Sequence, residues 1–255
     1  MIMLTAPKQR LQRQPGLTGI LNSVPHPDIV EMIAVAGYDF AILDLEHLPH
    51  DEPRLKHLIQ LASLNGCAPL VRIAAADIPR AGRLLDLGAH GIVLSRAESA
   101  EQLCALRDAM FFPPLGNRGI TGGSVTGFGK LPLDEYIRRA NDNLWLVPMI
   151  ESPRGADAID TLLRIPQVSM VMEGALDLAI SMQLGPQPTH PQVERQIREL
   201  AARCAAAEVL FCANPRTAEQ QRYWQSQNVR CWLCGEDRGF FFRTLKQRLS
   251  ECRGK

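Results

Sequence analysis

Short apolar runs alternate with longer amphipathic segments from one end of the chain to the other. The short runs carry apolar residues at successive positions, which is typical of strands that are covered on both faces. Their alternation with helix-length segments predicts parallel strands joined by helical crossovers. We expect eight strands, over residues 17–24, 40–45, 69–73, 91–95, 144–150, 168–172, 209–213 and 229–234.

The segments between these strands begin and end with residues that fit helix boundaries. Pro27 and Asp28 open a segment that closes on Gly37. Asp51 opens a segment that closes on Gly66, and Thr217 precedes another. Asp and Thr are good N-caps and Gly is a common residue just after a helix, so these positions predict helix limits.

The last amphipathic segment, residues 240–252, has an apolar stripe of its own. Helical spacing places Phe241, Leu245 and Leu249 on one face. Such a face needs an apolar partner surface, either on the same barrel or on a neighbouring subunit.

Eight strands within 255 residues fit a (β/α)8 TIM barrel better than an open doubly wound sheet. An open sheet of that kind usually has a glycine-rich phosphate turn after its first strand, and no GxGxxG follows residue 24 here. No internal repeat, low-complexity tract or linker divides the chain. We therefore expect a single (β/α)8 domain over residues 1–255.

Composition narrows the classes of partner. The chain is 46% hydrophobic and 22% charged, and its net charge is only +1. This balance argues against nucleic acid or an anionic membrane surface as a partner and favours a small molecule. No apolar stretch approaches the roughly 18–20 residues of a membrane span, and the first residues do not fit a signal peptide. We expect a cytoplasmic protein.

The seven cysteines do not form a disulfide framework, because they are scattered through predicted strands and helices. Cys231 and Cys234 make one CxxC motif within a strand-like run. Residues three apart on a strand face opposite sides, so this geometry argues against a zinc or redox pair.

Polar residues end several of the predicted strands, and the carboxyl ends of barrel strands are where active sites form. They are Glu46 and His47 after the second strand, Arg72 in the third, Glu151 after the fifth, and Glu173 with the nearby Asp177 after the sixth.

A carboxylate at the end of a buried strand is costly to desolvate unless a cation or several hydrogen-bond donors contact it. Glu151 and Asp177 could share a divalent metal, Mg²⁺ or Mn²⁺, with a chelating 2-oxo acid and waters. The alternative is that each carboxylate pairs with an arginine or caps a helix.

His47 is a candidate general base at neutral pH, although a single histidine fits a loop equally well. Arg72 offers planar donors to a carbonyl or carboxylate oxygen, and Asp44 or Asp86 could orient the imidazole. Arg118 lies in a glycine-rich loop, residues 117–130, whose backbone amides suit an anion or a mobile cover. The spacing of that loop does not match a P-loop.

The motifs AGYDFAILDLEHLPHD, PLVRI, LLDLGAHGIVL, NRG, PMIESPRGADAID and EGALDLAIS occur in this order along the chain. Together they resemble the HpcH/HpaI aldolase family over nearly the whole length. The resemblance implies that Glu151 and Asp177 bind the metal, and that Arg72 contacts the oxo-acid oxygen. It implies that His47 moves protons with Asp86 as its partner. It also implies a homo-oligomer, a dimer or hexamer, in which subunits commonly exchange the C-terminal helix.

One stretch departs from the family pattern. Typical members read close to IGPxDLS up to the metal aspartate, whereas this chain reads EGALDLA over residues 173–179. The extra carboxylate of Glu173 and the missing proline alter the floor of the substrate site, where we expect contacts from Glu173, Gly174, Ala175 and Arg118. EGALDL, together with the region over residues 21–40, looks most like the branch typified by the citrate synthase of staphyloferrin B siderophore biosynthesis.

Two reactions fit such a site. In the first, the metal and Arg72 polarise the oxo group of oxaloacetate, and the enolate of acetyl-CoA attacks it to give citrate. In the second, metal-bound pyruvate forms the enolate and attacks an aldehyde, as in a class II 4-hydroxy-2-oxo acid aldolase.

Co²⁺ is a further candidate metal for either reaction. Arg216 could meet a phosphate of coenzyme A or form a surface salt bridge. A third hypothesis is a non-catalytic barrel that binds a metabolite, although such a module would not need a proton shuttle.

Overall fold

The computed structural model describes residues 4–48 and 51–254, in which parallel strands form a closed barrel. Each strand pairs with the next one in sequence, and the last closes on the first. The strands are β1 (Leu17–Asn22), β2 (Phe40–Asp44), β3 (Ala68–Ile73), β4 (Gly91–Leu94), β5 (Trp145–Ile150), β6 (Met170–Glu173), β7 (Leu210–Ala213) and β8 (Cys231–Glu236). The predicted (β/α)8 barrel and its strand order are confirmed.

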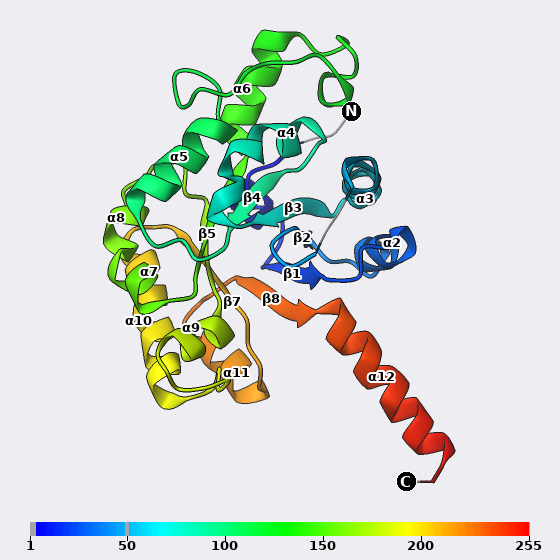
Figure 1. Cartoon of the computed structure of the whole chain (residues 1–255), viewed down its shortest axis with the longest axis vertical. Helices are drawn as coiled ribbons and strands as arrows, with labels where there is room; N and C mark the ends of the chain where they lie inside the picture. The colour runs from blue at the N-terminus through cyan, green and yellow to red at the C-terminus, as the bar shows by residue number, and fades with distance from the viewer. Residues whose placement is uncertain (1–3, 49–50, 255) are drawn as a thin grey trace.

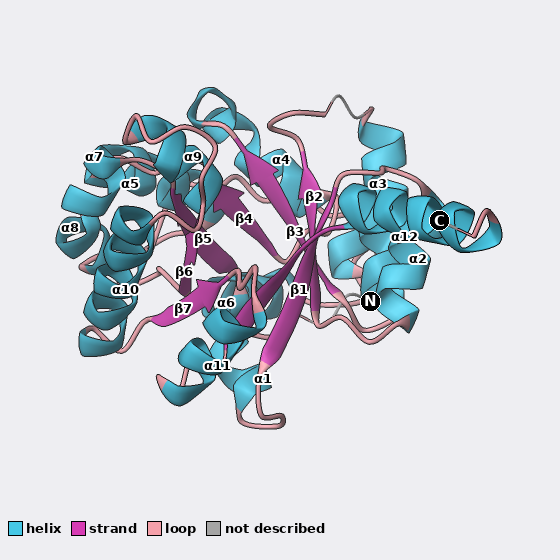
Figure 2. Ribbon diagram, turned by 90° about the horizontal axis from the view of Figure 1, so that it is seen from below, coloured by secondary structure: helices cyan, strands magenta, loops and turns pink. Residues whose placement is uncertain are grey.

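The chain also forms helices, most of which surround the strands on the outside of the barrel (Figures 1 and 2). They are α1 (Pro7–Leu11), α2 (Pro27–Val35), α3 (Glu52–Leu64), α4 (Ala81–Asp86), α5 (Ala100–Met110), α6 (Leu133–Asn143), α7 (Pro153–Asp157), α8 (Ile159–Leu163), α9 (Ala175–Ser181), α10 (Pro191–Ala206), α11 (Ala218–Ser226) and α12 (Asp237–Cys252). Two of the expected caps are present. The side chain of Asp51 accepts a hydrogen bond from the N–H of Arg54, and that of Thr217 accepts one from Gln220.

Alternate residues of each strand belong to two different cores. One set fills the inside of the barrel with large side chains, including Phe40, Ile42, Leu70, Trp145, Val147, Met149, Met170 and Met172. The intervening residues face outward and pack against the helices, including Ala41, Leu43, Val71, Leu146 and Val171. This alternation follows from the pleat of a strand, and it decides which polar residues can reach the interior at the strand ends.

The first and last strands differ from their predicted limits. β1 ends at Asn22, two residues early, because the N–H groups of Ser23 and Val24 donate to the carboxylate of Asp237 instead of continuing the sheet. β8 continues to Glu236, because Glu236 pairs with Leu21 of β1 after a register shift.

The C-terminal helix α12 extends away from the barrel (Figure 1). Its main contacts are with β1 and β8, near the point where the helix begins. The predicted stripe is exposed, with Phe241 at 59%, Leu245 at 54% and Leu249 at 50%. The barrel of the same chain therefore does not supply the partner surface, and exchange of this helix between subunits stays a prediction.

The CxxC cysteines are free thiols. Cys231 belongs to the core inside the barrel, whereas Cys234 lies at a position of opposite parity on the same strand. In the part of the chain that is described, no helix is both long and apolar enough to cross a membrane.

Candidate active site at the carboxyl ends of the strands

Three polar residues continue the inward-facing positions of their strands. Asp44 follows Phe40 and Ile42 on β2, Arg72 follows the inward-facing Leu70 on β3, and Glu151 follows Met149 after β5. All three are buried, with 2%, 7% and 3% of their surfaces exposed. The alternation of the strands therefore gathers charged groups at the carboxyl end of the barrel, where a (β/α)8 enzyme carries its chemistry.

Arg72 is fixed by a bidentate ion pair with Asp44. Its Nε and Nη2 donate to Oδ1 and Oδ2 of Asp44, each at 2.9 Å. Burial by itself raises the pKa of Asp44, but the hydrogen bonds and charge of Arg72 outweigh it, so the pKa lies below its usual value. No hydrogen bond from Nη1 to another described residue is present, so this nitrogen can donate to a substrate oxygen.

Glu151 has an environment that suits a cation. Its Oε2 accepts a hydrogen bond of 2.8 Å from the backbone N–H of Arg96, which has a positive φ of 46°. Gly174 lies directly against it, since a Cβ at that position would be 2.4 Å from Cγ of Glu151. Burial, and then the negative charges of Glu46 and Asp177, raise the pKa of Glu151 to about 7.

Carboxylates outnumber the available cations around Glu151. Oε2 of Glu46 is buried and has no hydrogen-bond partner among the residues that the structure describes, although it lies 3.3 Å from Nε of Arg72. Asp177 is exposed in the first turn of α9. Arg72 already compensates Asp44, so Glu46, Glu151 and Asp177 leave an excess of negative charge that fits a divalent cation with oxygen ligands.

Protein side chains do not complete a metal site by themselves. Within residues 4–48 and 51–254, no group of three or more His, Cys, Asp or Glu residues is placed to hold an ion. Glu151 and Asp177 would supply two ligands, and substrate and water would have to supply the rest.

His47 lies at the mouth of the barrel, after β2, and its side chain is 65% exposed. Among the described residues, its carboxylate neighbour is Glu46, whose Oε2 lies 3.7 Å from Nε2 of His47. Asp44, one of the two residues expected to orient the imidazole, instead holds Arg72.

Asp86, the other expected partner of His47, lies at the opposite end of the barrel. It ends α4, shortly before β4 begins, and therefore lies toward the amino ends of the strands, away from His47. Oδ1 of Asp86 accepts a hydrogen bond of 2.6 Å from Nη2 of Arg118. Within one chain, Asp86 and Arg118 thus contact each other and not the residues at the mouth. Their expected roles at the mouth require a second subunit.

We expected Glu173 to contact the substrate, but its side chain faces outward from the barrel, toward the helices. It follows Val171, an outward-facing residue of β6. Its Oε1 accepts from the N–H of Asn214 at 2.9 Å and from Nη1 of Arg216 at 3.1 Å. Its Oε2 accepts from the N–H of Ala175 at 3.0 Å and from Nη2 of Arg216 at 3.3 Å. Glu173 thus forms an ion pair with Arg216. A salt bridge was one of the two alternatives for that arginine, but it involves a buried carboxylate and does not lie on the surface as expected.

The same bonds affect the expected contacts of Gly174 and Ala175. The N–H of Gly174 donates to the carbonyl of Ile150, and the N–H of Ala175 donates to Glu173. Gly174 contributes space for Glu151, and neither N–H is free in this structure.

Two further groups belong to the cluster although the sequence assigns them no role. Glu46 follows the second strand with the same inward parity as Asp44, and this parity is the signal that could have identified it. The N–H of Arg96 has no signal in the sequence, because its contact with Glu151 arises only where the segment after β4 passes β5.

The barrel and the charged cluster at its carboxyl end are the arrangement expected of a (β/α)8 enzyme. Residues 19–231 match the family model HpcH/HpaI aldolase/citrate lyase, and the chain belongs to this family. The hydroxypyruvate/pyruvate aldolase of Delftia acidovorans is 32% identical over 85% of this chain and 81% of its own. The 2-keto-3-deoxy-L-rhamnonate aldolase of Escherichia coli (strain K12) is 29% identical over 95% of this chain and 91% of its own.

Solved structures agree with this assignment. The crystal structure of citrate synthase SbnG is 31% identical, with a TM-score of 0.90 and 98% coverage of both chains. An HpcH/HpaI aldolase from Desulfitobacterium hafniense DCB-2 is 26% identical, with a TM-score of 0.91, covering 98% of this chain and 97% of its own.

Proposed function

We propose that this protein is a metal-dependent citrate synthase, which joins oxaloacetate to the acetyl group of acetyl-CoA for the assembly of a siderophore of the staphyloferrin B type. The observation that carries the metal-dependent chemistry is Glu151. It is a buried carboxylate at the inner mouth of the barrel, with a pKa raised to about 7 and further carboxylates around it. Such a group favours a cation as its partner.

Glu151 and Asp177 would hold the metal, and Mg²⁺ fits their hard oxygen ligands, with Mn²⁺ or Co²⁺ as alternatives. A divalent cation bound there supplies Lewis acidity to the oxo group of the substrate. Asp177 is exposed and Glu151 is buried, so the ion would lie between solvent and the barrel interior.

The residues of the chain then divide the work. Arg72, held by Asp44, donates from Nη1 to the oxo oxygen, where negative charge develops as the new bond forms. His47 takes a proton from the methyl group of acetyl-CoA. The methyl carbon then bonds to the oxo carbon of oxaloacetate, and the oxo oxygen gains a proton to become a hydroxyl. Water finally cleaves the C–S bond of the thioester, which releases citrate and coenzyme A.

Similarity to SbnG at 31% identity over almost the full length of both chains supports the citrate synthase reaction. The alternative is a class II 4-hydroxy-2-oxo acid aldolase, which releases pyruvate and an aldehyde. It is favoured by the 32% identity to the hydroxypyruvate/pyruvate aldolase. In both reactions the 2-oxo acid lies against Arg72 and the metal.

A homo-oligomer follows from the same proposal. The apolar face of α12 is uncovered, and Asp86 cannot serve His47 of its own chain from the other end of the barrel. A second subunit would supply both a cover for α12 and a carboxylate for His47.

The two activities can be separated in parallel assays with Mg²⁺. One contains oxaloacetate and acetyl-CoA and is followed by release of free thiol; the other contains pyruvate and an aldehyde and is followed by consumption of pyruvate. Thiol release that depends on oxaloacetate supports the synthase, and turnover in the second assay alone supports the aldolase. Undiminished turnover with excess chelator would refute the metal-dependent mechanism in either case.

A further inference from the structure

A cavity of about 420 Å³ lies away from the mouth of the barrel. Its lining includes Ala89 and Leu144, which come just before β4 and β5, so it opens near the amino ends of these strands. The catalytic cluster lies at the carboxyl ends. The volume is within the range of small-molecule sites, so the cavity is large enough for a ligand of its own.

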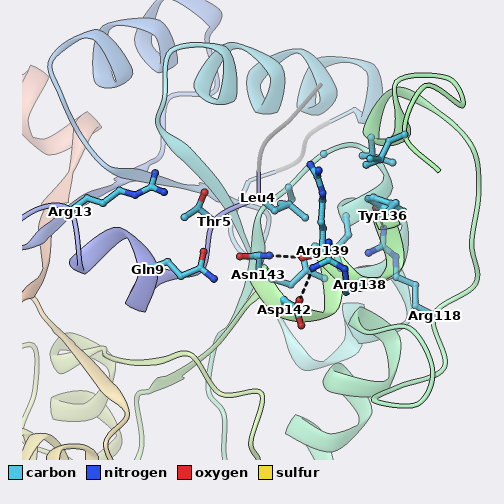
Figure 3. A pocket seen from close by; sticks show the side chains of 16 residues that line it. Leu4, Thr5, Gln9, Arg13, Arg118, Tyr136, Arg138, Arg139, Asp142 and Asn143 are labelled. Atoms are coloured by element: carbon cyan, nitrogen blue, oxygen red, sulfur yellow. Dashed lines mark hydrogen bonds and ion pairs between the residues drawn. The ribbon is translucent and has the colours of Figure 1, made fainter. Parts of the chain in front are cut away.

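Side chains from two helices face each other across this cavity (Figure 3). Gln9 and Arg13 come from α1 and the residues just after it, and Tyr136, Arg138 and Arg139 come from α6. Between them lie apolar residues that include Leu4, Leu85, Leu131 and Leu144. The walls therefore combine hydrogen-bond donors with apolar surface.

Positive charge prevails in the lining. Arg138 lies 3.6 Å from Asp142, and Arg139 pairs with Glu135. Arg118 pairs with Asp86. The side chain of Arg13 has neither an ion pair nor a hydrogen bond in the described part of the chain, so one arginine charge is left without a carboxylate.

The side chain of Arg118 has buried hydrogen-bond donors that lack acceptors among the described residues. Its side chain is only 2% exposed, and both of its hydrogen bonds, to Asp86 and to the hydroxyl of Tyr136, come from Nη2. Nε and Nη1 are buried and have no hydrogen-bond partner among residues 4–48 and 51–254, while the guanidinium lies over the ring of Phe112, 4.7 Å from its centroid. Buried donors without acceptors cost free energy, and additional negative charge near this group would offset that cost.

We propose that the cavity is a second ligand site, which binds a small molecule carrying an oxyanion group on an apolar body. The oxyanion, a carboxylate or a phosphate, would lie between the wall of Arg13 and the wall of Arg138 and Arg139, where the positive charges of both walls and of Arg118 attract it. The apolar part would pack on the leucines. Arginine suits both kinds of oxyanion because its planar donors match their oxygens. This ligand would bind at the opposite end of the same barrel from the proposed reaction.

Calorimetric titration of the full chain with phenyl phosphate and with benzoate tests the site, with phenol as the uncharged control. We expect saturable binding of at least one of the two anions and none of phenol. Tighter binding of phenyl phosphate would identify a phosphate ligand, and tighter binding of benzoate a carboxylate ligand.

Variants locate the binding. Arg13→Ala and Arg138→Ala should each weaken it by about fivefold, because each removes one positive charge from the walls of the cavity. Both side chains are largely exposed, so neither change should disturb folding. Arg72→Ala should leave binding unchanged, and so should Arg203→Ala, a matched exposed arginine on α10 that pairs with Asp160. The proposal is overturned if neither anion binds saturably, or if binding survives loss of Arg13 and Arg138 together.

Discussion

Glu151 and Glu173 follow or end neighbouring strands and are almost equally buried, at 3% and 2% exposure, but their surroundings are opposite. Glu151 faces the inside of the barrel, where its side chain accepts one hydrogen bond, from the N–H of Arg96, within the described residues. Glu173 faces the helices, where its oxygens accept bonds from Arg216, Asn214 and Ala175. Among the described residues, Glu151 has no cationic partner of its own, whereas Glu173 is paired with Arg216.

The pleat of the strands explains the difference. Glu151 has the parity of Met149, which points inward, and Glu173 has the parity of Val171, which points outward. Both carboxylates stand at a strand end, yet only the inward one can take part in chemistry at the mouth. The outward one stabilises the packing of β6 against the following segments.

Glu151→Gln should give the largest effect in this comparison. It keeps the shape of the side chain but removes the negative charge proposed to bind metal, so kcat/KM should fall by at least about 1000-fold. Steady-state kinetics with saturating Mg²⁺ measures the fall, and an unchanged circular dichroism spectrum controls for folding. Activity within a few-fold of the parent would contradict the role of Glu151.

Glu173→Gln should act on stability instead. It removes the charge partner of Arg216 and turns an amide toward the donors of Asn214 and Arg216, which should cost about 3 to 4 kcal/mol of unfolding free energy. Urea denaturation measures the change. Glu199→Gln, at an exposed position, is the matched control and should shift stability by less than about 0.5 kcal/mol. Equal stability of the two variants would show that the ion pair of Glu173 does not stabilise the fold.

The metal-free stability of Glu151→Gln should change in the opposite direction. The folded-state pKa of Glu151 is raised to about 7 from its ordinary value of 4.5, so its ionisation penalises the fold above pH 7 and not below pH 4.5. The variant should therefore exceed the parent by about 3 kcal/mol at pH 8 and lose this advantage as the pH falls toward 4.5. Denaturation in chelator across this range checks the trend, and a pH-independent difference would contradict it.

Gly174→Ala should have the smallest effect of the series. The new Cβ would be 2.4 Å from Cγ of Glu151 and would displace the carboxylate, so we expect activity to fall by about 10- to 100-fold with the fold retained. Gly122→Ala is the control, because nothing lies within 4 Å of the position that its Cβ would take. Equal activity of the two variants would show that Glu151 tolerates displacement.

Local patterns in the sequence were sufficient to predict the barrel. The eight apolar runs and the helices between them follow from neighbouring residues, and the caps Asp51 and Thr217 act within three positions of themselves. The position of Asp86 before the fourth strand could also have placed it away from His47, because helices return the chain to the amino ends of the strands.

The cluster of charged residues around Glu151 at the mouth of the barrel was only partly predictable from the sequence. Glu151, Arg72 and Asp177 stand at or near strand ends in the sequence, but this position alone does not distinguish Glu151 from Glu173. Counting parity from the large residues of each strand would have done so, and would also have favoured Glu46.

By itself, the sequence determined the order and approximate positions of the strands, the helix caps and the residues that stand at the strand ends, because these depend on contacts a few positions apart. Only the tertiary structure decided that Arg216 reaches Glu173 across 43 positions, that Asp86 holds Arg118, and that the N–H of Arg96 meets Glu151. Closure of the barrel brings these distant segments together, and the partners of a buried charge are set by that packing in space.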